Sequence, residues 1–175
     1  MKDFSLFLSI IFIGLSATLC IDIYSLYLKR FFNIPSLDYK FVGRWLIYCC
    51  RGKFFHHTIM QSPEKAGEKY VGWLAHYLIG ILFSYIFIIL IGSSWINIPT
   101  LLPALIMGIM TVIIPFFIMQ PCLGFGWAAS RLATPYYARL KSLSTHAVFG
   151  VGLYLGACLL QFLLLQSRNL NNFFH

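Results

Sequence analysis

Four long apolar stretches constrain what this chain can fold into more than any other feature of its sequence. They comprise residues 4–28, 71–91, 101–119 and 143–165. Each is close to the length of about 20 residues that a helix needs to cross the hydrocarbon core of a bilayer. Because lipid offers no partner for backbone N–H and C=O groups, and because the stretches lack strand-like alternation, we predict helices. The sequence thus predicts an all-α, polytopic membrane protein with four transmembrane helices.

The composition agrees with this class and argues against others. Apolar residue types make up 59% of the chain and charged types 10%, so the 175 residues are expected to form one integral membrane domain, residues 1–175. The formal net charge of +8 fits basic loops that face anionic lipid head groups. No nucleic-acid-reading module accompanies this charge, so nucleic acid is not an expected partner.

Lysine and arginine are divided unevenly between the two sides of the predicted membrane. Eight of the 13 lie in the segment 29–70 and three more lie between residues 131 and 141, whereas the loop 92–100 has none. Because positively charged loops remain in the cytoplasm, we expect residues 29–70 to form a cytoplasmic loop and both termini to be periplasmic. The expected location is therefore the bacterial inner membrane.

One part of the segment 29–70 has the periodicity of an amphipathic helix. Apolar residues recur at helical spacing from Leu37 to Cys49, and Ser36 is a candidate N-cap. The basic residues lie largely off the apolar face: Lys40, Arg44 and Arg51. We therefore expect a helix that lies in the cytoplasmic interface of the membrane.

Two prolines are expected to shape the later spans. Pro115 lies inside the third span and should kink it, because proline lacks a backbone N–H and clashes with the preceding turn. Thr134 followed by Pro135 is typical of a helix start, so the fourth helix should begin near Pro135.

Small residues recur one helical turn apart within the spans, which allows membrane helices to approach closely. The pairs are Gly14 and Thr18, Gly80 and Ser84, Ala104 and Gly108, and Gly152 and Gly156. The second and fourth spans also begin with the same pattern, a histidine four residues before a glycine (His76 and Gly80, His146 and Gly150). This echo suggests two parallel two-helix repeats, and chance also accounts for a match this short.

Each span places a polar side chain in the half of the membrane that is expected to face the cytoplasm. These residues are Asp22, His76, Gln120 and His146. Ionisable groups at such depth cost free energy and are candidate functional residues. We expect Asp22 to be charged and to pair with Arg44 of the amphipathic helix, because an unpaired carboxylate would bind a proton instead.

Three interpretations of this polar layer remain open. Asp22, His76 and His146 could line a cavity for an ion, a proton or a head group, and such a set could ligate a transition metal. Alternatively, the layer is structural, with the histidines hydrogen-bonded between helices. An enzymatic role is the third, although no nucleophile elbow or catalytic residue is recognisable. His56 and His57 are weak metal-ligand candidates, and no cofactor can be assigned.

Several ordered blocks of sequence extend over nearly the whole chain. They include Val42-Gly43-Arg44-Trp45, Gly72 to Tyr77, Met119-Gln120-Pro121, Ala128 to Arg131 and His146 to Gly150. Together they resemble a family of small four-span bacterial inner-membrane proteins that is classed as a domain of unknown function. The resemblance implies the location and the fold, and it implies no activity. The family pattern maps onto Asp22, Arg44, Trp45, His56, His76, Gln120, Arg131 and His146, while Tyr48 stands where relatives often have a histidine.

The sequence favours a non-enzymatic membrane component, either a small carrier or an accessory or structural subunit. The alternative is a membrane-embedded enzyme or a metal- or ion-binding protein that uses Asp22, His76 and His146. The expected partners are the lipid bilayer and its anionic head groups. A second copy of the chain or another membrane protein is a further candidate partner.

Overall fold

The computed structural model describes residues 2–173, which form helices and loops without a β-strand. Four segments are long and apolar enough to cross a membrane: Phe4–Phe32, Glu68–Ile91, Leu101–Leu123 and Pro135–Ser167. The predicted all-α fold with four spans is therefore confirmed. The spans belong to α1 (Lys2–Phe32), α3 (Glu68–Ile91), the α4 segment that begins at Leu101, and α6 (Pro135–Phe173).

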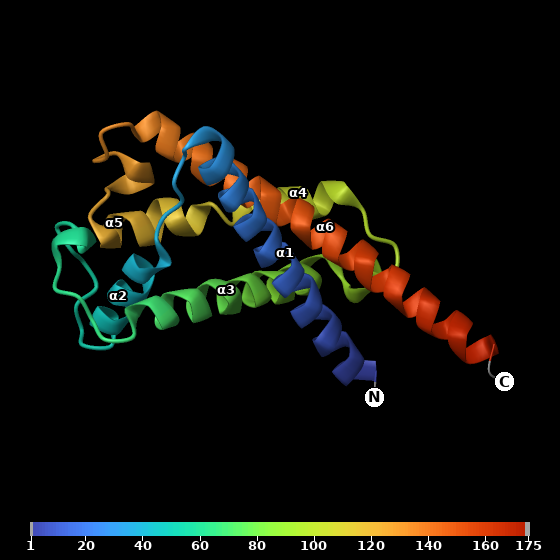
Figure 1. Cartoon of the computed structure of the whole chain (residues 1–175). Helices are drawn as coiled ribbons and strands as arrows, with labels where there is room; N and C mark the ends of the chain where they lie inside the picture. The colour runs from blue at the N-terminus through green and yellow to red at the C-terminus, as the bar shows by residue number, and fades with distance from the viewer. Residues whose placement is uncertain (1, 174–175) are drawn as a thin grey trace.

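The helices extend beyond the apolar stretches at both ends of the bundle. α6 begins at Pro135, as the Thr-Pro pair predicted, and therefore starts eight residues before the apolar stretch at Leu143. Hydropathy marks only the part of a helix that suits lipid, whereas the helix itself continues through polar turns. Figure 1 shows the start of α1 and the end of α6 at one end of the molecule and the loops around α2 and α5 at the other.

Glycines allow the helices to cross closely within each half of the chain. A Cβ atom on Gly14 of α1 would lie 2.7 Å from the Cα of Ile81 in α3. A Cβ atom on Gly108 of α4 would lie 2.6 Å from the Cα of Gly150 in α6. The small residues thus lie at helix contacts, as expected, and equivalent glycines serve both halves.

The third span is not one regular helix. α4 (Leu101–Met110) ends in a turn at Thr111 and Val112, a π-helix (η3) covers Pro115–Met119, and the short α5 (Gln120–Leu123) completes the span. Pro115 cannot donate a backbone hydrogen bond to the preceding turn, and the predicted kink is confirmed. The backbone N–H of Gln120 bonds to the carbonyl of Pro115, five residues earlier. The span consequently extends to Leu123 rather than ending at Met119.

The amphipathic helix differs from the expectation in two ways. α2 (Tyr39–Cys49) is capped by Asp38, whose Oδ1 accepts a hydrogen bond from the Lys40 N–H at 3.0 Å, and not by Ser36. Arg44 was expected to lie off the apolar face of this helix. It is instead 1% exposed and lies inside the protein. α2 packs closely against the start of α3, because Gly43 and Gly72 leave room for backbone contact.

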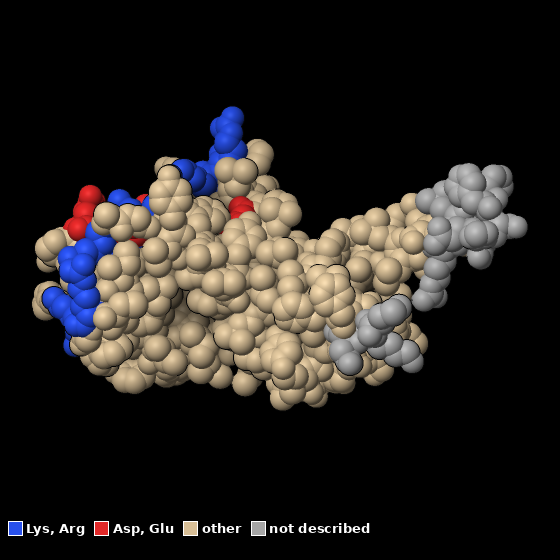
Figure 2. All heavy atoms as spheres, turned by 90° about the horizontal axis from the view of Figure 1, so that it is seen from below, with Lys and Arg blue, Asp and Glu red and all other residues tan. Residues whose placement is uncertain are grey.

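Two groups of buried side chains hold the bundle together. The larger group lies between the long spans and includes Ile13, Ala17 and Leu153, none of which is measurably exposed. The smaller group lies at the loop end of the bundle, where Ile59 of η1 (Ile59–Gln61) packs in one cluster with Leu123 and Phe125. Figure 2 shows most of the charged side chains gathered toward this loop end, while the part of the visible face farthest from it is uncharged.

At the opposite end, the connection between α3 and α4 is short and ordered. Its helix η2 (Ser93–Ile96) buries Trp95 against Phe87, with the two ring centroids 4.7 Å apart. Gln161 of α6 donates a hydrogen bond of 2.9 Å to the carbonyl of Ile96. These contacts close the end of the bundle that carries no basic loop.

Candidate functional site

A cavity of about 380 Å³ lies between α1, α2, α3, η3 and α6, near the loop end of the bundle. Its volume falls in the range of about 300–1,000 Å³ that is usual for ligand pockets. Loop residues such as Ser36 and Phe125 form part of its wall, and most of the lining is apolar. Three of the four residues of the predicted polar layer line this cavity: His76, Gln120 and His146.

Asp22 lies beside the cavity and binds two side chains of α3. Its Oδ1 lies 3.0 Å from Nε2 of His76, and its Oδ2 accepts a hydrogen bond of 2.8 Å from the Tyr77 hydroxyl. The ring of Tyr39 stacks on His76 with a centroid separation of 4.0 Å. Burial and the nearby charge of Asp22 raise the pKa of Tyr39, which keeps its hydroxyl protonated. Asp22 thus pairs with His76, and the predicted Asp22–Arg44 pair is wrong.

Arg44 instead forms a buried ion pair with Glu68 at the start of α3. Its Nε and Nη2 donate to the two carboxylate oxygens at 2.8 and 2.7 Å, and Nη1 donates to the carbonyl of Ser62 at 2.8 Å. The hydrogen bond to Glu68 raises the pKa of Arg44. The close α2–α3 contact places Arg44 over this carboxylate, out of reach of the end of α1. Arg44 therefore fixes the loop and does not belong to the cavity.

Glu68 is a structural residue that the sequence analysis missed. One signal was available, since Glu68 is one of only five acidic residues in the chain and stands in the first turn of a span. An acidic side chain is favoured there by the helix dipole. Its partner depends on how α2 folds back against α3, which the periodicity of α2 alone does not reveal.

The hydrogen bonds around His146 fix which of its ring nitrogens carries the proton. The Thr111 hydroxyl lies 2.6 Å from the carbonyl of Gly108 and 2.7 Å from Nδ1 of His146. A hydroxyl has one proton, and the carbonyl can only accept, so Nδ1 of His146 must be the donor to Thr111. In the neutral imidazole, Nε2 is then left as a hydrogen-bond acceptor.

Gln120 is the cavity residue whose hydrogen bonding is incomplete. Its side chain is 8% exposed, and its Oε1 is buried without a hydrogen-bond partner among the described residues. The residue begins α5 directly after the π-helix, whose wider turn changes the direction in which the following side chains project. A buried amide oxygen without a partner costs free energy, on the order of 1–3 kcal/mol. A bound ligand with a donor would remove this cost.

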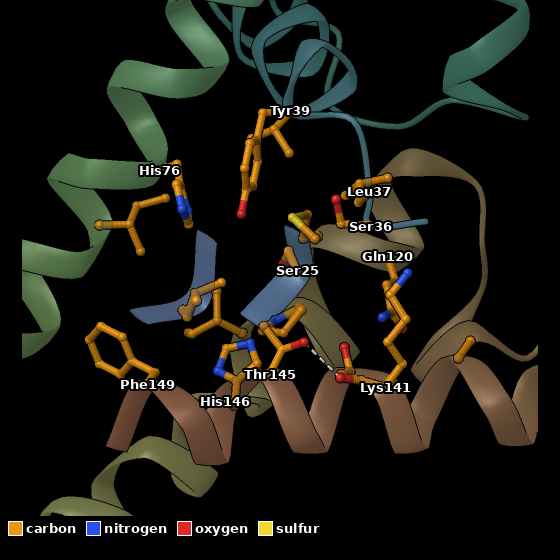
Figure 3. Close-up of a pocket in the computed structure, with 18 of the residues that line it drawn as sticks. Ser25, Ser36, Leu37, Tyr39, His76, Gln120, Lys141, Thr145, His146 and Phe149 are labelled. Atoms are coloured by element: carbon orange, nitrogen blue, oxygen red, sulfur yellow. Dashed lines mark hydrogen bonds between the residues drawn. The ribbon is translucent and has the colours of Figure 1, made fainter. Parts of the chain in front are cut away.

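Lys141 is a second cavity residue that the sequence analysis did not select. It stands on the same helix as His146, and its ammonium donates a hydrogen bond to the carbonyl of Pro35. Figure 3 shows Lys141 and Gln120 on one side of the cavity and His76 and Phe149 on the other. The predicted helix start near Pro135 already placed Lys141 in the first turns of the fourth helix, but it was counted there only as a positive-inside residue, because hydropathy does not reveal that these turns line a cavity.

The two adjacent histidines do not form a joint site. His56 is 6% exposed and its Nδ1 lies 2.9 Å from the hydroxyl of Ser62, whereas His57 is exposed. Burial, together with the positive charge of Lys53, lowers the pKa of His56. Among the side chains that the structure describes, no group of three or more His, Cys, Asp or Glu is placed to hold a metal ion.

The comparison with protein families agrees with the blocks seen in the sequence. Residues 11–160 match the family described as "Protein of unknown function (DUF2938)", and the chain belongs to this family. The match includes the whole cavity lining. Searches of the curated proteins and of the solved structures found no match.

Proposed function

We propose that the protein is a non-enzymatic component of the bacterial inner membrane that binds a small ligand between its spans, as a small carrier or an accessory subunit does. The observation that carries this proposal is the buried Oε1 of Gln120, which has no partner among the described residues and lines a cavity with His76 and His146. A purely structural polar layer is expected to be fully paired and dry. The unpaired amide favours a ligand.

The orientation in the membrane is part of the same proposal. Eleven of the 13 lysines and arginines belong to the segments 29–70 and 131–141, which include the loops at the cavity end. The positive-inside rule then orients the cavity end toward the cytoplasm and both termini toward the periplasm. Reporter fusions after Arg51 and after Arg139 should read cytoplasmic, and fusions near Ser94 and after Asn171 should read periplasmic. Cytoplasmic activity at Ser94 would contradict this orientation.

Ligand binding is tested by asking what the protein retains through purification. The chain is purified in mild detergent, and bound small molecules, lipids and metals are identified by native mass spectrometry and elemental analysis. We expect a bound molecule in the wild type that is lost in Gln120→Leu. The matched control is Gln161→Leu, which alters a glutamine of α6 that bonds to Ile96 at the far end of the bundle.

A purely structural polar layer would give a different result in this experiment. If the polar layer is purely structural, the wild type retains no molecule. Replacing the unpaired amide of Gln120 by leucine would then raise stability, because a buried unsatisfied group is removed without loss of a ligand. That combination would refute the proposed ligand binding.

A second candidate function is favoured by a separate observation. His76 and His146 both line the cavity, and Asp22 binds His76 from beside it. This arrangement suits a proton-binding or enzymatic role, whereas a metal ion would require the side chains to move, because no three of them among the described residues are placed to hold one. A stoichiometric transition metal that is lost in His76→Gln and in His146→Gln would favour this candidate over the carrier.

A further inference from the structure

The cavity has a polar side and an apolar end. Figure 3 shows Lys141, Gln120 and Ser36 gathered on one side, with Phe149 on the opposite side. Lys141 and Phe149 are eight residues apart on α6, which corresponds to about 12 Å along a helix. The ring of Phe149 meets that of Phe83 with a centroid separation of 6.1 Å, and both residues line the cavity. A ligand that fills this space therefore needs a polar head and an apolar body.

The charge of the cavity indicates the sign of that head. Within the described structure, Lys141 is the only residue of the lining that carries a full charge irrespective of histidine protonation. An ammonium has three N–H donors, and the hydrogen bond to Pro35 uses one of them. Asp22 is not part of the lining, and its two carboxylate oxygens are turned to His76 and Tyr77. The electrostatics favour an anionic oxygen.

Gln120 and the hydroxyl groups supply the remaining specificity. The Nε2 of Gln120 can donate a hydrogen bond to an anionic oxygen, whereas its unpaired Oε1 can accept one only from a head group that keeps a proton, such as a singly ionised phosphate. Ser36 and Ser142 line the same cavity and provide further hydroxyl donors. A cation would instead meet the Lys141 ammonium, and a fully apolar molecule would leave both the ammonium and the amide of Gln120 without a ligand partner.

From the polar side and the apolar end of the cavity, we propose that it takes an anionic amphiphile of the membrane. The carboxylate or phosphate head lies between Lys141 and Gln120, and one acyl or prenyl chain is directed toward Phe83 and Phe149. The proposal rests on the ligand binding proposed above and names its class. The head lies at the loop end of the bundle, where the charged side chains gather (Figure 2). The chain lies among side chains that suit lipid.

The test uses the full chain in mild detergent with a fluorescent long-chain fatty acid as the probe. Palmitic acid, hexadecanol and inorganic phosphate are compared as competitors. We expect palmitic acid to displace the probe at concentrations at least about tenfold lower than hexadecanol, which is the factor expected for one hydrogen bond to a charged group. This comparison is made on the wild type and so does not depend on any variant folding.

Variants then locate the head group. Lys141→Met and Gln120→Leu should each weaken acid binding by about tenfold, while binding of hexadecanol changes little in Lys141→Met. Lys69→Met is the matched control, because Lys69 is an exposed lysine of α3 outside the cavity lining. Its acid affinity should equal that of the wild type. Gel filtration and thermal unfolding of each variant verify that it is folded.

The outcomes separate this inference from the proposed function. If hexadecanol competes as well as palmitic acid, the anionic head is refuted and ligand binding stands. If millimolar phosphate alone displaces the probe as effectively as the acid, the site takes a soluble anion and the amphiphile is refuted. If neither the acid nor the alcohol competes and the probe does not bind, ligand binding itself fails.

Discussion

Removing the Arg44 side chain should destabilise the protein more than removing any exposed charge. Arg44→Met deletes two hydrogen bonds to Glu68, one to the exposed Glu64 and three to the backbone carbonyls of Ile59, Met60 and Ser62. It leaves Glu68, which is 8% exposed, without its cation. Breaking one side of a buried ion pair costs about 3–5 kcal/mol. We expect a loss of this size, with the loop between α2 and α3 affected first.

The assay is equilibrium unfolding in mixed dodecyl maltoside and SDS micelles, combined with limited proteolysis of the loop. Lys40→Met is the matched control, because Lys40 and Asp38 form an exposed pair with an N–O distance of 3.8 Å. An exposed pair of this kind contributes less than about 1 kcal/mol. The double variant Arg44→Met with Glu68→Leu should regain much of the loss, since no charge is then left buried.

Two results would refute this reasoning. A cost for Arg44→Met as small as that for Lys40→Met would mean that water solvates Glu68 in the variant. A double variant no more stable than Arg44→Met would mean that the arginine acts through its backbone carbonyl partners rather than through the carboxylate.

Three further predictions concern other contacts. Gly150→Val should destabilise the bundle by about 1–3 kcal/mol or more in the same assay, because its Cβ would lie 2.6 Å from a carbonyl oxygen of α4. Asp22→Asn should cost about 1–3 kcal/mol, since an NH2 group that cannot accept replaces one of the two carboxylate oxygens that bond to Tyr77 and His76; a cost near zero would count against this network. Because burial lowers the pKa of His56 in the folded protein, the unfolded chain binds more protons than the folded one below about pH 6.5. The free energy of unfolding should therefore fall from about pH 6.5 toward pH 5, and it should fall by less in His56→Gln.

The spans were predictable because hydropathy and helix length are local properties of the sequence. The crossing glycines were also visible as repeated small residues, and Pro115 and Pro135 marked a real kink and a real helix start. The ion pairs were not predictable in the same way. The sequence pattern paired Arg44 with Asp22, and only the packing of α2 on α3 selects Glu68 instead.

The candidate site could be predicted only in part, for a similar reason. His76, Gln120 and His146 were selected because polar residues in a span are rare, and they line one cavity. Lys141 was missed, because a lysine near a loop resembles any other positive-inside residue. Its place in the cavity depends on where α6 begins and on the register of α6 against the segment around Pro35.

The contact between α1 and α6 has a consequence for biosynthesis. Gly152 of α6 packs against Ala17 of α1, and both helices contribute to the cavity wall. The cavity therefore has no complete wall until the ribosome has synthesised α6 and the translocon has released it. Before that moment Asp22 already has His76 and Tyr77 of α3 as partners, whereas Thr111 waits for His146. A nascent chain arrested after α4 should accordingly hold its first two spans together and remain open to lipid on the side that α6 later covers.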